Sequence, residues 1–285
     1  MRTILLWNDD WGIVGPPRPL GIPGWEIVHD RRMAPLADAI AFHIPTLDEA
    51  AMPHGRHPGQ RFVAWSMESV VNYPCLDDPA YMARFDLSMT YRRSSDIWVP
   101  YIPRPEILLV PPGTKSEAAP AVYIASNPRN RSGRDDYVAE LMRHLPVDSY
   151  GTQLRNRTLE GDDGRRTKLL TIARYRFTLA FENSIAPDYV TEKFFDALIA
   201  GSVPVVLGAP NVRDFAPSAH SYIDKADFDG PAALAAYLRG LAADETAYAE
   251  YLAWKRSGLS PEFGAMLSAG RPDPWTRLAR LLIAT

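Results

Sequence analysis

The sequence contains little of several features that would assign a protein to a class at once. It has a single cysteine, Cys75, so no intrachain disulfide can form and no cysteine-rich zinc site exists. No window approaches the roughly 20 apolar residues that a membrane-spanning helix needs, and the apolar run from Ile4 to Trp7 is too short for a secretory signal. We therefore expect a cytoplasmic protein without a transmembrane segment, for which peripheral contact with a membrane stays open.

Other absences remove whole classes of function. Basic and acidic residues nearly balance, at 31 against 34, which argues against a nucleic-acid partner bound through a broad cationic face. No G-x-G-x-x-G follows a strand, and neither G-x-x-x-x-G-K-[ST] nor G-x-S-x-G occurs, so the dinucleotide, P-loop and serine-hydrolase motifs are missing. His54 and His57 lack cysteine or acidic partners at ligand spacing, so we predict loop histidines and no metal site.

At 285 residues the chain exceeds the usual size of one domain, so we expect two. The first hundred residues alternate short apolar runs with turn-rich stretches, which predicts several strands. We place these strands at Arg2–Trp7, Trp25–Val28, Ala39–His43, Arg61–Trp65 and Ile97–Tyr101. The segment from Pro111 to Pro120 combines proline, glycine, serine and lysine and predicts a linker.

After this linker, strands alternate with helices. Strands are predicted at "AVYIAS", "RYRFTLAFEN" and "SVPVVLG", with a short one closed by "SYG". Helices are predicted at "SGRDDYVAELMRHL", "VTEKFFDALIAG", Pro231–Ala242, Glu245–Arg256 and "DPWTRLARLLIA". Gly201 ends the second of them, as a C-cap glycine would. This alternation predicts an α/β fold with a parallel, doubly wound sheet.

One predicted strand ends in Glu182 and Asn183, and a helix begins near Thr191 shortly afterwards. In open α/β sheets, ligands sit beyond the carboxyl ends of strands, beside helix N-termini. The free amides and the helix dipole there favour an anion such as phosphate. Lys193 adds a full positive charge, and Glu192 can accept hydrogen bonds from the hydroxyls of a sugar or a base.

Each of these residues also has a purely structural interpretation. Glu192 suits the first turn of any helix, Lys193 can be a solvated charge, and Tyr189 taken alone is more often a packing residue. Glu182 and Asn183 can be turn formers at the end of a strand. Their concentration within one short run favours the polar wall of a single site.

A basic loop follows the strand "VYIAS" and contains or adjoins Arg129, Arg131 and Arg134. Bidentate guanidinium–phosphate contacts are geometrically natural in such a loop, although any one of these arginines could be an ordinary surface residue. In the first half of the chain, Glu68 follows an apolar strand. A lone carboxylate there is usually a cap or a turn residue, but inside a cleft it would have a raised pKa and could act as a general base.

Taken together, these stretches resemble the α-1,3/4-fucosyltransferase family, glycosyltransferase family 10. The match is dense over Arg174–Phe228, which contains "FENS", "DYVTEK" and "VPVV". Two further matches are "YRRSSDIWVPY" at Tyr91–Tyr101 and "SNPRNRSGR" after the predicted linker. The single cysteine makes the chain more similar to the compact bacterial members than to animal members, which carry paired cysteines.

The resemblance implies a GT-B architecture of two Rossmann-like domains facing a cleft. We expect an N-terminal, acceptor-side domain over residues 1–116 and a GDP-sugar-binding domain over residues 117–270. A C-terminal helix over residues 271–285 is expected to pack back on the N-terminal domain.

Carried over position by position, the resemblance makes Glu68 in "SMES" the catalytic base. The donor-binding set that it implies is Arg134, Tyr189, Glu192, Lys193, Asn183, Glu182 and Tyr101. No metal ligand belongs to it, and we expect no obligatory cofactor, because protein cations can stabilise the departing GDP.

The implied function is the inverting transfer of L-fucose from GDP-β-L-fucose to an oligosaccharide acceptor. The expected product is an α-1,3 linkage to an N-acetylglucosamine-containing glycan. Two alternatives stay open at this point: a transferase of the same family that uses another nucleotide sugar, and a non-catalytic module that only binds a nucleotide sugar.

Overall fold

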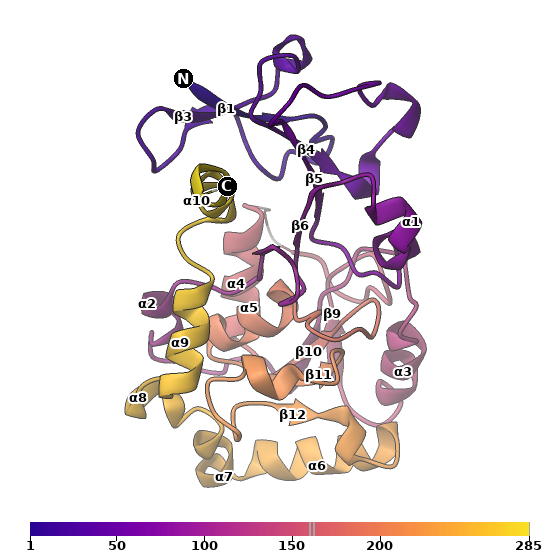
Figure 1. Cartoon of the computed structure of the whole chain (residues 1–285). Helices are drawn as coiled ribbons and strands as arrows, with labels where there is room; N and C mark the ends of the chain where they lie inside the picture. Colours follow the sequence, from indigo (N-terminus) through magenta and orange to yellow (C-terminus); the bar gives the residue numbers. More distant parts are fainter. Residues whose placement is uncertain (160, 162, 285) are drawn as a thin grey trace. The chain divides into compact units, whose positions relative to one another are not determined.

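The computed structural model describes residues 1–159, 161 and 163–284. The chain divides into two compact units (Figure 1): unit 1 is Met1–Pro100 with Gly270–Thr285, and unit 2 is Tyr101–Ala269. The domain limits expected from the sequence stay predictions, because compactness does not assign a function to either unit. Residue 285, which ends the expected C-terminal helical segment, lies outside the described residues.

Unit 1 is built on a seven-stranded sheet with the order β2-β3-β1-β4-β5-β6-β7. Neighbouring strands run parallel except β2 and β3, which pair antiparallel. The strands are β1 Arg2–Leu6, β2 Arg18–Pro19, β3 Trp25–Val28, β4 Ala39–His43, β5 Arg61–Ser66, β6 Leu87–Thr90 and β7 Ile97–Trp98. Strands β4 and β5 are buried almost throughout, as apolar runs in a parallel sheet should be.

The predicted strands β1, β3, β4 and β5 are confirmed to within one residue at each end. The strand predicted over Ile97–Tyr101 is shorter, because β7 ends at Trp98 and Pro100 has no N–H to continue the ladder. Strand β6 was not predicted, since Ser88 and Thr90 interrupt its apolar pattern. The short helix α1, Pro79–Met82, was not predicted either.

The C-terminal helix α10, Pro274–Ala284, belongs to the core of unit 1. Trp275, Leu278 and Leu282 recur at helical spacing and are buried in one cluster with side chains of β1, β4 and β5. The ring of Trp275 meets that of Trp65 edge-on, with centroids 5.3 Å apart. Because each such burial stabilises a fold by about 1.5–3 kcal/mol, this helix supplies a substantial part of the stability of unit 1.

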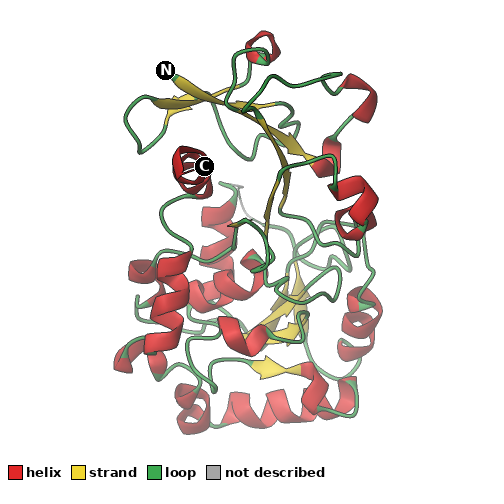
Figure 2. Cartoon of the chain, in the orientation of Figure 1, coloured by secondary structure: helices red, strands yellow, loops and turns green. Residues whose placement is uncertain are grey.

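Unit 2 contains a five-stranded parallel sheet with the order β12-β11-β10-β8-β9. Its strands are β8 Ala121–Tyr123, β9 Val147–Ser149, β10 Phe177–Phe181, β11 Val203–Leu207 and β12 Ile223–Asp224. Its helices are α2 Pro105–Leu108, α3 Arg134–Leu141, α4 Arg165–Ala173, α5 Glu192–Ala200, α6 Pro231–Ala243, α7 Glu245–Glu250, α8 Trp254–Ser257 and α9 Pro261–Ala269. Figure 2 shows these helices flanking the strands of the sheet, so the predicted α/β fold is confirmed.

Helix α5 is confirmed, with Thr191 as its N-cap and Gly201 in the left-handed conformation as its C-cap, at φ 69°. The single helix predicted over Glu245–Arg256 is wrong, because α7 ends at Glu250 and α8 begins at Trp254. The turn between them places further apolar side chains in the core of unit 2. Helices α4 and α9 were not predicted.

The linker predicted from Pro111 to Pro120 has no helix or strand, but it is fastened to unit 2. Lys115 Nζ donates to the carbonyl oxygens of Ala173 at 2.9 Å and Gly201 at 2.7 Å, which lie at the ends of α4 and α5. Burial lowers the pKa of Lys115 to about 8. One side chain therefore caps two helices at once, and the segment is an integral part of unit 2.

In both sheets the chain changes the side on which it adds strands. In unit 2 it leaves β8 towards β9 and then returns to build β10, β11 and β12 on the other side. In unit 1 it leaves β1 towards β3 and returns to build β4 to β7 on the other side. The loops at such a switch point part in opposite directions and open a crevice at the carboxyl ends of the strands, where ligands of α/β sheets bind. The topology thus indicates one candidate site in each unit.

Candidate functional site

The switch point of unit 2 gathers most residues of the predicted donor site. Strand β10 ends at Phe181 and leads through residues 182–191 to α5, while β8 ends at Tyr123 and leads through residues 124–133 to α3. The first connection and the start of α5 hold Glu182, Asn183, Tyr189, Glu192 and Lys193. Arg134 is the first residue of α3.

The carboxylate of Glu182 joins the end of β10 to the start of α5. Thr191 donates its backbone N–H and its hydroxyl to Glu182 Oε1, both at 2.8 Å. The Thr191 side chain also accepts from the backbone N–H of Lys193, which is the N-cap bond. Gly208, just past β11, leaves the room that this carboxylate needs, because a Cβ there would lie 2.9 Å from Glu182 Cγ. A buried carboxylate therefore sets where the helix begins.

Lys193 lies between two carboxylates. Its Nζ is 3.2 Å from Glu182 Oε2 and 3.1 Å from Glu192 Oε1, and it donates to Thr191 Oγ1 at 3.0 Å. Burial alone would lower the pKa of Lys193, but the two carboxylates raise it above its ordinary value. The ammonium group is therefore charged at neutral pH.

The two carboxyl groups respond to this ammonium group differently. Burial raises the pKa of Glu182 and outweighs the opposing effect of Lys193. Burial also acts to raise the pKa of Glu192, but Lys193 and Lys168 together lower it to about 2. The Glu192 side chain is 40% exposed. It is thus an ionised acceptor that a ligand can reach.

Two further cations come from α4, which the sequence analysis did not find. Arg165 donates from Nε and Nη2 to Asp196 Oδ1 at 3.0 and 2.7 Å, and Lys168 Nζ lies 2.9 Å from Asp196 Oδ2. Asp196 is fully buried on α5, whereas the Arg165 side chain is 55% exposed. The signal was present in "GRRTKLLTIA", where a glycine precedes apolar residues at helical spacing.

These groups surround a hollow of about 470 Å³ in unit 2. It is lined by Tyr101, Gly164, Arg165, Lys168, Glu192 and Asp196. The structure thus brings two predicted residues, Tyr101 and Glu192, together with the two cations of α4. An aromatic ring can stack on a base, a carboxylate can accept from hydroxyls, and cations can pair with phosphate. This combination suits a nucleoside diphosphate.

Three predicted residues lie at the switch point but beneath its surface. The Arg134 side chain is 1% exposed, and its Nη2 donates to the carbonyl oxygen of Asn127 at 2.8 Å and its Nη1 to that of Phe181 at 3.3 Å. Tyr189 is 2% exposed and Asn183 is 4% exposed. Arg134 therefore ties the connection that follows β8 to the end of β10.

Glu68, the predicted base, lies in unit 1, beyond the carboxyl end of β5. Its backbone N–H donates to Ser66 Oγ at 3.1 Å, and Val70 N donates to the Tyr91 hydroxyl at 3.3 Å. The residue is half-buried. It therefore occupies the edge of the sheet at which ligands of parallel sheets bind.

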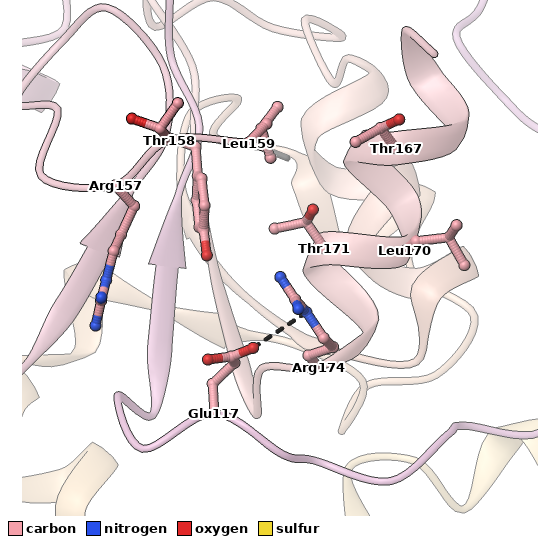
Figure 3. A pocket seen from close by; sticks show the side chains of 9 residues that line it. Glu117, Arg157, Thr158, Leu159, Thr167, Leu170, Thr171 and Arg174 are labelled. Atoms are coloured by element: carbon pink, nitrogen blue, oxygen red, sulfur yellow. Dashed lines mark ion pairs between the residues drawn. The ribbon is translucent and has the colours of Figure 1, made fainter. Parts of the chain in front are cut away.

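A larger hollow, of about 680 Å³, lies on the other face of α4 (Figure 3). It is lined by Glu117, Tyr150, Arg157, Thr158, Leu159, Thr167, Leu170, Thr171 and Arg174. Arg174 Nε pairs with Glu117 at 3.1 Å, and Arg157 Nε pairs with Asp148 at 2.9 Å. Because its described lining includes no predicted site residue, size alone does not make this hollow the donor site.

Within the part of the chain that the structure describes, no helix could cross a membrane. No three or more His, Cys, Asp or Glu side chains in that part are grouped to hold a metal ion. His57 instead bonds two backbone carbonyl oxygens, that of Ala37 through Nε2 at 3.1 Å and that of Pro58 through Nδ1 at 3.0 Å.

Two family models match the chain. The model described as glycosyltransferase family 10 (fucosyltransferase) C-term matches residues 114–267, and the one described as fucosyltransferase, N-terminal matches residues 1–102. Together they cover most of both units and include every residue predicted for the site.

Similar proteins carry related names. The chain is 32% identical over 275 residues to alpha-(1,3)-fucosyltransferase B of Drosophila melanogaster, covering 90% of this chain and 61% of that protein. It is 38% identical over 206 residues to GDP-fucose protein O-fucosyltransferase 3 of Gallus gallus, covering 66% of this chain and 43% of that protein. The chain thus spans about half the length of these relatives.

The fold comparison agrees with the family models. A crystal structure of alpha1,3-fucosyltransferase with GDP-fucose matches with a TM-score of 0.53 and 17% identity, over 95% of this chain and 91% of that one. This likeness confirms the predicted fold class, GT-B with two Rossmann-like units. The resemblance inferred from the sequence is confirmed as well: the chain belongs to glycosyltransferase family 10, the fucosyltransferase family.

Proposed function

We propose that this chain is an inverting fucosyltransferase, which moves L-fucose from GDP-β-L-fucose to a hydroxyl of an N-acetylglucosamine-containing glycan. An α-1,3 linkage is the expected product. The observation that carries the proposal is the hollow of unit 2, where Tyr101, Glu192, Arg165 and Lys168 meet in a chain of family 10. The similar protein from Drosophila melanogaster is named an alpha-(1,3)-fucosyltransferase, which supports an α-1,3 linkage.

In this proposal, cationic side chains hold the negatively charged diphosphate of the donor. When the bond between fucose and GDP breaks, negative charge grows on the β-phosphate, and preorganised cations that face it are worth several kcal/mol. Arg165, Lys168 and Lys193 supply these cations beside the N-terminus of α5. Glu192 accepts hydrogen bonds from hydroxyls of the donor, and Tyr101 offers a ring face.

The buried members of the donor set act by position. Arg134 holds the connection after β8 against the end of β10 through its bonds to two carbonyl oxygens, and direct contact with phosphate would require it to become exposed. Glu182 sets the start of α5, while Asn183 and Tyr189 fill the wall behind it. Arg129 and Arg131 lie exposed on the neighbouring connection, between β8 and α3.

Glu68 acts as the general base in this mechanism. Its carboxylate takes the proton of the acceptor hydroxyl as that oxygen attacks the anomeric carbon of fucose. The bond from that carbon to the β-phosphate oxygen breaks, and its electron pair leaves with GDP. The configuration inverts because attack and departure occur on opposite faces of the sugar. Such a base typically contributes 10² to 10⁴ in rate.

A second acceptor class has a specific observation in its favour. The relative from Gallus gallus is named as a protein O-fucosyltransferase and is 38% identical over its matched part. A protein hydroxyl is therefore the competing acceptor. A transferase that uses a different nucleotide sugar, and a binding module without catalysis, are distinguished from the proposal by the same experiment.

The test is to incubate the protein with GDP-fucose and with chitobiose, lactose, type 1 and type 2 disaccharides or unfolded peptides, and to analyse products by mass spectrometry and NMR. Fucosylation of an N-acetylglucosamine disaccharide supports the proposal. Fucosylation of peptides alone would move the acceptor to the second class. Binding of GDP-fucose without turnover on any acceptor would favour the binding module. A parallel panel of other GDP-sugars tests the donor.

Two further expectations belong to this proposal. Activity should survive EDTA, because the cations of α4 and α5 can stabilise the leaving diphosphate. Complete loss of activity that only Mn²⁺ restores would contradict a metal-independent mechanism.

A cytoplasmic location, which the sequence predicts, is to be tested by fractionating cells that express the full-length protein.

A further inference from the structure

The switch point of unit 1 lies between β1 and β4, and a buried amide joins the segments that leave it. Asn8, just past β1, donates from Nδ2 to the carbonyl oxygen of His43 and to Thr46 Oγ1, both at 2.8 Å. Its Oδ1 accepts from the backbone N–H of His43 at 3.0 Å. A crevice is expected at the carboxyl ends of these strands, and the hydrogen bonds of Asn8 hold the segments on its two sides in a fixed position.

Aromatic rings adjoin these hydrogen-bonded segments. The ring of His43 contacts the rings of Trp11 and Trp65, with centroid distances of 4.8 and 4.7 Å. His43 and Trp65 are buried, but Trp11 is 48% exposed. Asp9 accepts the backbone N–H groups of Ile13 and Val14 at 2.8 and 2.9 Å, which pins the turn that presents Trp11. A large ring is thus held at the surface where an α/β sheet binds its ligand.

The charges around this ring select against an anionic ligand. Asp9 and the exposed Asp10 immediately precede Trp11. Burial lowers the pKa of His43 to about 4, so its ring is neutral at pH 7. Its Nδ1 bonds Thr46 Oγ1 at 2.9 Å, while no described residue bonds its buried Nε2. The chemistry contrasts with that of the donor hollow in unit 2, which is lined by cations.

We propose that the crevice between β1 and β4 binds the acceptor as a neutral pyranose, with the exposed face of Trp11 as its platform. One face of a pyranose ring consists of C–H groups and can pack on an indole ring, while its hydroxyl rim can bond carboxylates such as Asp10. The buried ring of His43 meets that of Trp11 edge-on, and His43 is therefore a positioning residue. This inference deepens the proposed function, since it names residues that recognise the acceptor of that reaction.

The experiment measures saccharide binding and transfer separately in the full chain. Binding of chitobiose and N-acetyllactosamine is followed by saturation-transfer NMR without donor, and transfer is followed with GDP-fucose. We expect Trp11→Ala to weaken saccharide binding and to raise the KM for the disaccharide about tenfold or more. Trp11→Phe should recover most of the loss. GDP affinity and the slow hydrolysis of GDP-fucose should stay unchanged in both variants.

The matched control is Ile13→Ala, which removes an apolar side chain of the same turn that is 49% exposed, and it should leave binding unchanged. Saccharide binding that Trp11→Ala leaves intact would overturn the inference. So would a wild-type protein that binds GDP but no saccharide, or one in which peptides displace the saccharide. Trp11-dependent saccharide binding without transfer from GDP-fucose would instead support the platform and refute the proposed function.

Discussion

Each of the two sheets has a switch point in its strand order, but the side chains around the two switch points differ in chemistry. At the switch point of unit 2, Glu182, Glu192 and Lys193 form a dense network of charges, in which the ammonium group lies within 3.2 Å of both carboxylates. At the switch point of unit 1, a neutral His43 contacts two indole rings, those of Trp11 and Trp65. The parallel sheet determines where a crevice opens, and the connections that leave it determine what the crevice can bind.

The largest contrast between the units should appear when one carboxylate of unit 1 is neutralised. Glu68→Gln should lower kcat about 10²- to 10⁴-fold, because the acceptor hydroxyl loses its base, while the Kd for GDP stays the same. Steady-state kinetics and calorimetry measure the two quantities. Glu26→Gln, at a half-buried position on β3, is the control and should keep normal turnover. Normal turnover in the Glu68 variant would remove this residue from the role.

In unit 2 the corresponding change should affect binding and stability. Lys193→Met leaves Glu182 buried without its cation, and breaking a buried pair in this way costs about 3–5 kcal/mol. GDP affinity should fall with it. Urea unfolding and calorimetry check both effects. The double variant Lys193→Met/Glu182→Gln should regain part of the stability but not the GDP affinity. Equal stability of the single variant and the wild type would show that the pair is not closed in solution.

The two units should also differ in the pH range over which they lose stability. The pKa of His43 is lowered by burial from 6.5 to about 4, so the unfolded chain binds a proton in that window and the folded one does not. Stability is therefore lost as pH falls from 6.5 to 4, by up to roughly 3 kcal/mol. The pKa of Glu192 is lowered by Lys193 and Lys168, against the effect of burial, to about 2, so its contribution is lost only below pH 4.5.

Melting curves between pH 7.5 and 3 test this difference. His43→Phe should flatten the upper part of the profile and leave the part below pH 4.5 unchanged. Glu192→Gln should do the reverse. A His43 variant whose melting temperature falls between pH 6.5 and 4.5 as steeply as that of the wild type would contradict the assignment.

The smallest effect is expected in the larger hollow of unit 2. Arg174 and Glu117 are 48% and 26% exposed, and ion pairs at such positions contribute about 1 kcal/mol or less. Arg174→Ala should change stability within that limit and leave fucosyl transfer unchanged. Loss of GDP binding in this variant would move the donor site to the other face of α4.

The sequence predicts best where local signals suffice. Strands β3 and β4 follow from apolar runs, and α5 follows from a threonine cap, an apolar stripe and a final glycine. Helix α4 has a local signal that was overlooked, but the contacts of Arg165 and Lys168 with Asp196 form only in the folded chain and could not be predicted. Burial of Arg134 was equally hidden, since one of its partners, Phe181, lies 47 positions away at the end of β10.

The group of aromatic rings formed by Trp11, His43 and Trp65 in unit 1 was not predicted for a related reason. Trp11 and His43 lie 32 positions apart and meet only because β1 and β4 pair in the sheet. Neither residue is unusual in its own sequence neighbourhood. A search for polar and aromatic residues just beyond the ends of predicted parallel strands would have brought both of them forward.

The missing side chain of Gly208 has a consequence for variation in this protein. A methyl group there would press on Glu182, whose hydrogen bonds to Thr191 start the helix that carries Glu192 and Lys193. In a deep mutational scan, substitutions at position 208 should therefore reduce activity as substitutions of site residues do, although a glycine has no side chain to contact a substrate. The requirement for glycine at this position would then come from the space that the Glu182 side chain occupies.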